Sequence, residues 1–170
     1  MIVILMGVTG TGKTTVGRLL SSRTGWQFAE GDDYHSEANK AKMHAGIPLD
    51  DEDRAPWLAS LHDLLLGWFR RGESGILACS ALKQSYRDTL SAEIAREDLR
   101  FVLLKVSREH IAERLARRAN HYMNQALLDS QFATLETPSD ALAVSAEGTP
   151  EETVGLILQG LASAKAAGGM

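Results

Sequence analysis

The chain has little cysteine, no long apolar run and no excess of positive charge. Its one cysteine, Cys79, excludes an internal disulfide, which fits a reducing cytoplasm. No apolar run approaches the roughly 20 residues of a membrane span, and the run from Ile2 to Met6 is too short for the core of a signal peptide. The formal net charge of −4 argues against a general nucleic-acid binder. We therefore expect a soluble cytoplasmic protein with no nucleic-acid or membrane partner.

What the chain does contain is enough apolar sequence for one core. Of its 170 residues, 44% are hydrophobic. A single domain over residues 1–170 can therefore bury a stable core without a disulfide or a structural metal. The apolar runs that predict strands lie at 2–6, 26–29, 75–79, 101–106 and 142–145. The amphipathic segments that predict helices lie at 14–22, 37–44, 56–71, 84–96, 108–118 and 150–161. Alternating strands and helices predict a three-layer α/β fold of the P-loop NTPase type, a parallel sheet with helices on both faces.

The strongest motif is a glycine-rich loop directly after the first predicted strand. Residues 7–14, Gly-Val-Thr-Gly-Thr-Gly-Lys-Thr, match G-x-x-x-x-G-K-[ST] between an apolar strand and an amphipathic helix. In such a loop, backbone N–H groups and the helix amino end surround phosphate oxygens, the lysine reaches the outer phosphates and the hydroxyl can ligate Mg²⁺. The residues expected to bind ATP are Gly7, Val8, Thr9, Gly10, Thr11, Gly12, Lys13, Thr14 and Thr15. Lys13 is also a catalytic candidate, and Thr14 is the candidate Mg²⁺ ligand.

The loop alone does not separate ATPases, GTPases and kinases. A GTPase needs an N-K-x-D guanine-binding motif, whereas the segment 39–42 ends in lysine and follows no apolar strand. The predicted third strand ends at 78–80 without the carboxylate that a mechanical ATPase carries there. Asp32 and Asp33 follow the second predicted strand, at the edge where ligands of parallel sheets gather. Asp32 could face both the γ-phosphate and an acceptor hydroxyl, as in a small-molecule kinase. The alternative is that Asp32 and Asp33 only form a turn or cap a helix.

Further segments resemble the gluconate kinases, small P-loop enzymes related in layout to shikimate kinase. The matching residues, which extend over 3–160, are Gly31-Asp32, His35, Asn39, Lys42-Met43, 46–58, 79–83, Tyr86-Arg87, Arg114-Leu115, Arg118, His121, Leu127-Leu128, 130–132 and 134–136. Ser36 departs from the usual proline, and Tyr122 and Asn124 depart from the usual H-F-M-P. The resemblance implies transfer of the γ-phosphoryl group of ATP to the 6-hydroxyl of D-gluconate, with Mg²⁺, a cytoplasmic setting and a homodimer.

Gluconate carries a carboxylate at one end and the reacting hydroxyl at the other, so its site needs cations away from the phosphate loop. The resemblance favours Arg54, Lys83 and Arg87 for this role, with His35 also on the substrate. Alternatively, Arg54 only neutralises its acidic neighbours, and Lys83 and Arg87 only form a basic, solvent-exposed helix face. Asp32 would orient the hydroxyl and take its proton late, or help to hold Mg²⁺ through water. A kinase for another hydroxy acid or polyol, and a nucleotide-binding switch protein, stay open as alternatives.

A polar stretch without glycine, residues 119–129, follows a helix that carries Arg114, Arg117 and Arg118 on one side. We expect a small mobile lid near residues 114–135 that covers the transferring phosphate. Arg114 would contact the nucleotide and Arg118 would be catalytic, whereas an ordinary exposed helix face is the alternative. Cys79 and the tryptophans Trp57 and Trp68 are expected in the core.

Overall fold

The computed structural model describes residues 1–117 and 125–167 and is built around a parallel sheet. Its strands are β1 (Ile2–Met6), β2 (Gln27–Glu30), β3 (Gly75–Ala78), β4 (Leu99–Lys105) and β5 (Leu142–Ser145). Within the described ranges the strand order is β2-β3-β1-β4-β5, and all neighbouring strands run parallel. All of the strands that the sequence predicts are present, which confirms the expected α/β class.

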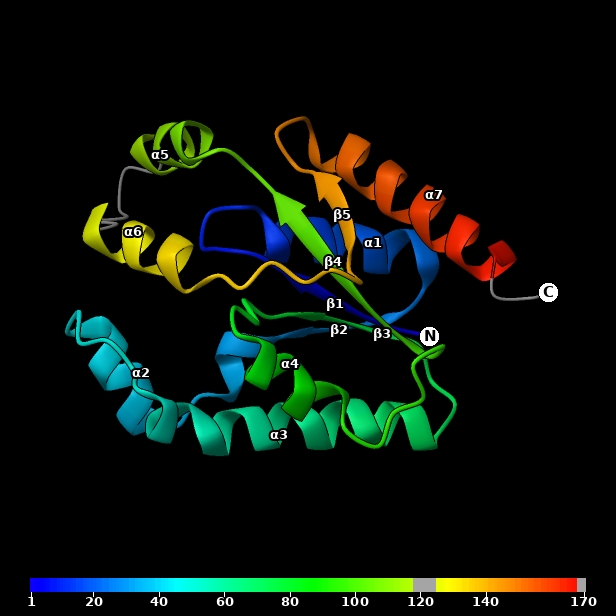
Figure 1. The fold of residues 1–170 in the computed structure, drawn as a ribbon, viewed down its shortest axis with the longest axis horizontal. Helices are drawn as coiled ribbons and strands as arrows, with labels where there is room; N and C mark the ends of the chain where they lie inside the picture. Colours follow the sequence, from blue (N-terminus) through cyan, green and yellow to red (C-terminus); the bar gives the residue numbers. More distant parts are fainter. Residues whose placement is uncertain (118–124, 168–170) are drawn as a thin grey trace.

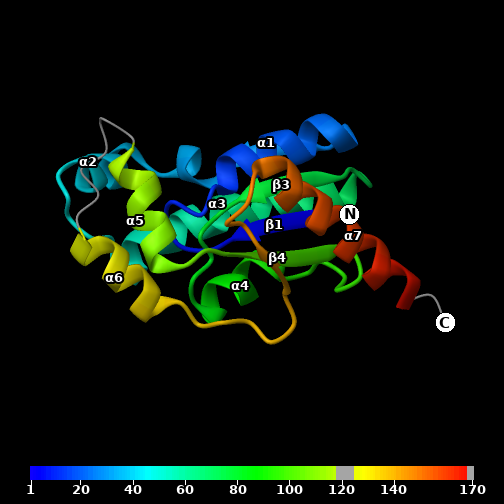
Figure 2. The same ribbon diagram turned by 90° about the horizontal axis from the view of Figure 1, so that it is seen from above.

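Helices cover both faces of the sheet, as Figures 1 and 2 show. They are α1 (Lys13–Thr24), the 3₁₀ turn η1 (Gly31–Tyr34), α2 (Glu37–His44), α3 (Asp51–Arg70), α4 (Gln84–Ser91), α5 (Arg108–Ala116), α6 (Gln125–Thr134) and α7 (Pro150–Ala167). In Figure 1, α3 and α4 lie below the sheet, while α1 and α7 lie above it. The three-layer prediction is therefore confirmed. Among the described helices, none is both long and apolar enough to cross a membrane.

The central strand β1 supplies side chains to two separate cores. Because successive strand residues point to opposite faces, Ile4 and Met6 pack with α3 and α4, whereas Val3 and Leu5 pack with α1, α5 and α7. All five residues of β1 are buried. This two-sided burial explains why a short, continuous apolar run is sufficient to predict the strand.

Helix α3 begins earlier than the sequence predicts. We expected Pro56 in the first turn, but the helix begins at Asp51 with Asp50 as its N-cap. The Asp50 carboxylate accepts from the Asp53 N–H at 2.7 Å, and Asp53 accepts from the Asp50 N–H at 3.2 Å. This capping box satisfies two free backbone donors, and the helix runs on through Pro56, which cannot donate an intrahelical bond.

Two other helix predictions also differ from the structure. Helix α4 ends at Ser91, short of the predicted Arg96, because the backbone leaves the helical region at Ala92, where ψ is 140°, and Glu93 follows with a φ of 60°. Ile94 nevertheless remains buried. Helix α6 lies within the segment that we expected to be a lid and was not predicted as a helix.

Candidate active site

The site candidates gather at the carboxyl edge of three neighbouring strands. The phosphate loop (residues 7–14) follows β1, the segment from Glu30 to His35 follows or ends β2, and the connection to Lys83 follows β3. In the sheet β3 lies between β1 and β2, and the Gly7 N–H donates to the Ser80 carbonyl at 3.3 Å. Ligands of open parallel sheets bind at this edge. The fold therefore brings the predicted nucleotide and acceptor residues to one place.

The phosphate loop takes a shape that depends on its glycines. Gly7, Gly10 and Gly12 have φ values of 140°, 86° and 94°, which side-chain-bearing residues rarely adopt. A Cβ on Gly10 would also lie 2.8 Å from Cγ2 of Ile111 in α5. Glycine is thus required here by backbone conformation and by close packing.

Lys13 lies folded over its own loop. Its ammonium donates to the carbonyl oxygens of Gly7 and Val8 at 2.9 and 3.0 Å. Burial lowers the pKa of Lys13, while the charge of nearby Asp32 acts in the opposite direction. The side chain is therefore already at the loop, and its ammonium can exchange carbonyl oxygens for phosphate oxygens.

Thr14 lies beside a carboxylate that the sequence analysis missed. Its hydroxyl donates to Glu30 Oε2 at 2.5 Å, and burial is the main reason that the pKa of Glu30 is raised. Mg²⁺ prefers oxygen ligands and binds through one or two protein groups together with substrate phosphates. The Thr14 hydroxyl and the Glu30 carboxylate are two oxygen donors side by side, so this pair fits Mg²⁺. The position of Glu30 at the carboxyl end of β2 was the signal that could have identified it.

Asp32 and His35 are positioned by Trp57. The indole Nε1–H of Trp57 donates to the Gly31 carbonyl at 2.7 Å, directly before Asp32. The Trp57 ring stacks on His35 with centroids 4.3 Å apart and planes 14° apart. Burial lowers the pKa of His35, and the Asp32 charge partly opposes that shift. Trp57 is buried as expected, but it also orders the segment that carries the candidate base.

Arg54 and Lys83 come together around Tyr86 and Asp51, and we call these four residues the cation cluster. Lys83 Nζ lies 3.1 Å from each Asp51 carboxylate oxygen, and the Tyr86 hydroxyl donates to Asp51 Oδ1 at 2.5 Å. Arg54 Nη1 donates to the Tyr86 hydroxyl at 3.3 Å. Both cations also approach the Tyr86 ring, at 5.7 Å for Arg54 and 5.4 Å for Lys83. The sequence indicated the two cations but neither Tyr86 nor Asp51 as members of this group.

Arg87 makes different contacts. It is only 3% exposed, and its guanidinium donates to Ala81 O at 2.8 Å, Leu82 O at 3.2 Å and Gln84 Oε1 at 2.9 Å. These bonds hold the connection between β3 and α4, in which Ala81 has a φ of 45°. The contacts in the structure are therefore to this connection, and the expectation that Arg87 binds the acceptor stays a prediction.

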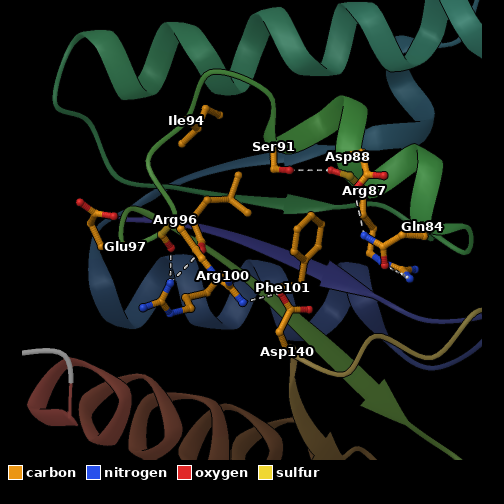
Figure 3. Close-up of a pocket in the computed structure, with 11 residues that line it drawn as sticks. Gln84, Arg87, Asp88, Ser91, Ile94, Arg96, Glu97, Arg100, Phe101 and Asp140 are labelled. Carbon is orange, nitrogen blue, oxygen red and sulfur yellow. Dashed lines mark hydrogen bonds and ion pairs between the residues drawn. The ribbon is translucent and has the colours of Figure 1, made fainter.

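A hollow of about 710 Å³ lies on another side of α4, and Figure 3 shows its lining. It includes Arg87, Arg96 and Asp140 and reaches Leu99, the first residue of β4. Leu99 pairs with Ile2 at the start of β1, whereas Gln84, also in the lining, is the first residue of α4. The hollow therefore runs along α4 from its first turn towards the end of the sheet opposite the phosphate loop. Arg96 is paired with Asp140 at 3.0 Å.

Two long-range contacts join the phosphate loop to the later part of the chain. Arg114 of α5 donates to Thr11 O at 3.4 Å and also to the Ala146 carbonyl. The Thr9 N–H donates to Gln131 Oε1 of α6 at 2.7 Å. Arg114 thus lies at the loop as expected, and Gln131 is an addition that the sequence analysis did not single out.

Part of the predicted lid cannot be compared with the structure. Arg118, Tyr122 and Asn124 lie outside the described residues, so the catalytic role of Arg118 and the lid itself stay predictions. Thr15 lies exposed at the start of α1. Cys79 is buried, and burial raises the pKa of its thiol to about 12, which agrees with its expected place in the core.

Known proteins are similar to this chain in sequence and in fold. A family model described as an AAA domain matches residues 2–138. The gluconokinase of Gluconobacter oxydans is 48% identical over 151 residues, which cover 87% of this chain and 84% of that protein. This chain belongs to the gluconokinase family. As in other P-loop kinase families, membership implies the use of a nucleotide.

Solved structures agree with the gluconokinase family assignment. The crystal structure of a gluconokinase from Sinorhizobium meliloti 1021 superposes with a TM-score of 0.85 at 41% identity, covering 95% of this chain and 91% of that one. A shikimate kinase from Aquifex aeolicus gives a TM-score of 0.61 at 20% identity, over 99% and 100% of the two chains. At that identity the second likeness concerns the fold alone, and it confirms the expected relation in layout.

Proposed function

We propose that this member of the gluconokinase family transfers the γ-phosphoryl group of ATP to the 6-hydroxyl of D-gluconate, giving 6-phospho-D-gluconate and ADP. The observation that carries the proposal is the arrangement at one sheet edge of a phosphate loop, an acidic segment and a pair of cations. An acceptor with a hydroxyl at one end and a carboxylate at the other needs this order of groups. The relatives named gluconokinase support the same acceptor.

The nucleotide side of the proposal rests on residues 7–15 and Arg114. Backbone N–H groups of the loop bind phosphate oxygens, and Lys13 neutralises charge on the outer phosphates. Thr14 and Glu30 would hold Mg²⁺ directly or through water, and Mg²⁺ supplies charge neutralisation on the transferring phosphates. Arg118 belongs to the catalytic group through the family resemblance.

The acceptor side rests on Asp32, His35, Arg54 and Lys83. Asp32 orients the primary hydroxyl towards the phosphate and accepts its proton late in the transfer. His35, held neutral at pH 7 by burial, hydrogen-bonds the polyol chain. Arg54 and Lys83 bind the carboxylate through charge-assisted hydrogen bonds. A homodimer and a cytoplasmic setting complete the proposal on the strength of the family resemblance.

The test is a coupled assay of ADP formation with a panel of acceptors. We expect ADP formation that depends on D-gluconate and exceeds that with other sugar acids, neutral polyols or no acceptor. Preference for a different acceptor would make the chain a kinase for that hydroxy acid or polyol. Nucleotide binding with no acceptor-dependent ADP would instead identify a switch protein.

A further inference from the structure

Asp51 is the common partner of the groups that the proposed function assigns to the acceptor carboxylate. Its carboxylate contacts Lys83 Nζ at 3.1 Å and the Tyr86 hydroxyl at 2.5 Å, and Arg54 Nη1 lies 4.0 Å away. These partners come from two elements, since Asp51 and Arg54 lie in α3 whereas Lys83 and Tyr86 lie at the start of α4. Asp51 is therefore part of the surface that an acceptor carboxylate would approach.

The cation cluster carries one uncompensated positive charge at neutral pH. The hydrogen bond from Tyr86, followed by that from Lys83, lowers the pKa of Asp51, which is therefore ionised. One carboxylate then offsets one of the two cations. The neighbouring Asp53 is itself bound to Lys42 at 2.7 and 2.8 Å, so it does not substitute for Asp51.

We propose that Asp51 is a specificity-determining residue that limits the far end of the acceptor to a single negative charge. The inference rests on the proposed function, because it concerns the end of the acceptor that lies away from the phosphate loop. A monocarboxylate can bind both cations while Asp51 stays in place. A dianionic group at the same position would meet the Asp51 carboxylate and would be repelled. A neutral polyol would lack the charge-assisted bonds.

The experiment uses three acceptors that share a six-carbon chain and a primary 6-hydroxyl but differ in far-end charge. They are D-glucitol, D-gluconate and D-glucitol 1-phosphate, which carry no charge, one negative charge and about two negative charges at that end. For Asp51→Asn we expect the kcat/KM ratio of D-glucitol 1-phosphate to D-gluconate to rise roughly 3- to 30-fold over wild type, since one repulsive charge is removed. Because the Asp51 side chain is 66% exposed, this rise should shrink at high salt.

Two matched variants separate charge at this position from other effects. Glu52→Gln removes the adjacent exposed carboxylate of α3 and should leave the ratio unchanged. Tyr86→Phe removes a hydrogen bond to Asp51 but no charge, so it should change kcat/KM for all three acceptors by a similar factor. An unchanged ratio in Asp51→Asn, or an equal rise in either control, would overturn the inference. The proposed function fails separately, if wild type shows no D-gluconate-dependent ADP formation.

Discussion

Lys13 illustrates how a single side chain can be positioned before its ligand arrives. Its ammonium is held by two carbonyl oxygens of its own loop, at 2.9 and 3.0 Å. Burial, which lowers the pKa of Lys13, makes the charged form more costly until an anion binds. A bound phosphate would remove that cost, so binding and charge stabilisation are coupled at this residue.

We expect Lys13→Ala to reduce kcat by about 10²-fold or more, because a charge-stabilising donor at the transferred phosphate is lost. The fold should persist, since within the described residues Lys13 bonds only to carbonyls of its own loop and contributes nothing to either apolar core. Steady-state kinetics and urea unfolding together check both parts. A folded variant with a kcat near that of wild type would remove Lys13 from the proposed mechanism.

His35 is expected to make stability depend on pH. Burial lowers its pKa in the folded state, below the value near 6.5 of an unfolded chain. The unfolded state therefore binds the proton more readily, so the contribution is full above about pH 6.5 and is lost as the pH falls through the folded pKa.

The matched variant is His35→Phe, which retains a ring against Trp57 and cannot titrate. Wild type should lose more free energy of unfolding than His35→Phe between about pH 7.5 and pH 5.5. Urea unfolding of both proteins at the two pH values measures the difference. Equal losses would show that other groups cause the acid sensitivity.

At the scale of elements, the connection from β3 to α4 depends on Arg87. The guanidinium donates to the carbonyls of Ala81 and Leu82, and the Glu136 N–H donates to Leu82 O at 2.9 Å. The same connection leads directly into Lys83, the N-cap residue of α4. Arg87 can therefore affect acceptor binding through Lys83 without touching the acceptor.

We expect Arg87→Met to lower the free energy of unfolding by about 1–3 kcal/mol, because the Ala81 carbonyl loses its bond from the guanidinium and the Leu82 carbonyl keeps only the Glu136 N–H. KM for D-gluconate should rise while KM for ATP changes little, since Lys83 loses its fixed position. Arg87→Lys, which restores one donor, should recover part of the stability. Kinetics and urea unfolding are measured on all three proteins. If Arg87→Met keeps wild-type stability and loses only acceptor affinity, Arg87 binds the acceptor directly.

The sequence predicted those elements whose signal is local. The run from Ile2 to Met6 is buried on both faces, and the predicted last helix begins at a capping box between Thr149 and Glu152, with bonds of 2.8 and 3.2 Å. The predicted start of α3 was wrong because two local signals compete. Pro56 suggests that the helix begins at residue 56, whereas the capping pair Asp50 and Asp53 makes it begin at Asp51. Local preference does not by itself reveal which signal prevails.

In the candidate site, too, the sequence predicted the contiguous parts and missed contacts between residues that are far apart in the chain. The phosphate loop is contiguous, so its pattern could be recognised directly. Asp51 and Lys83 are 32 residues apart, and Thr9 and Gln131 are 122 apart, so these contacts depend on the tertiary fold. Lys83 and Arg87 have the spacing of one helix face, yet Lys83 turns to Asp51 while Arg87 turns to the loop carbonyls. Helical spacing fixes a position on the helix but not the direction of a long side chain.

At the scale of the whole molecule, the site edge depends on how closely helices pack on the sheet. Gly17 lies buried in α1, and a Cβ there would be 2.5 Å from Cε2 of Phe28 and 3.3 Å from Cδ1 of Leu5. Gly155 lies exposed in α7, and a Cβ there would meet nothing within 4 Å. Both are helical glycines, so they form a matched pair that differs in packing.

We expect Gly155→Ala to raise the free energy of unfolding by about 0.5–1 kcal/mol, because alanine restricts the unfolded chain more than glycine and suits a helix interior. Gly17→Ala gains the same helical preference but must displace Phe28 or move α1 off the sheet, which costs about 1–3 kcal/mol. It should therefore be less stable than wild type. Urea unfolding of wild type and the two variants measures whether each substitution raises or lowers the free energy of unfolding.

The two glycine variants should also differ in their KM for ATP. Helix α1 begins at Lys13, directly after the phosphate loop, so a shift of α1 moves the groups that bind ATP. KM for ATP should rise in Gly17→Ala and stay near wild type in Gly155→Ala. A stable Gly17→Ala variant with unchanged KM for ATP would show that Phe28 moves aside and that α1 keeps its place. Since the Phe28 ring is only partly buried against its core, and Arg18 lies 5.5 Å from its centroid, that outcome would also displace Arg18 from the ring. The pair therefore tests whether the close approach of α1 to β2 holds the phosphate loop in position.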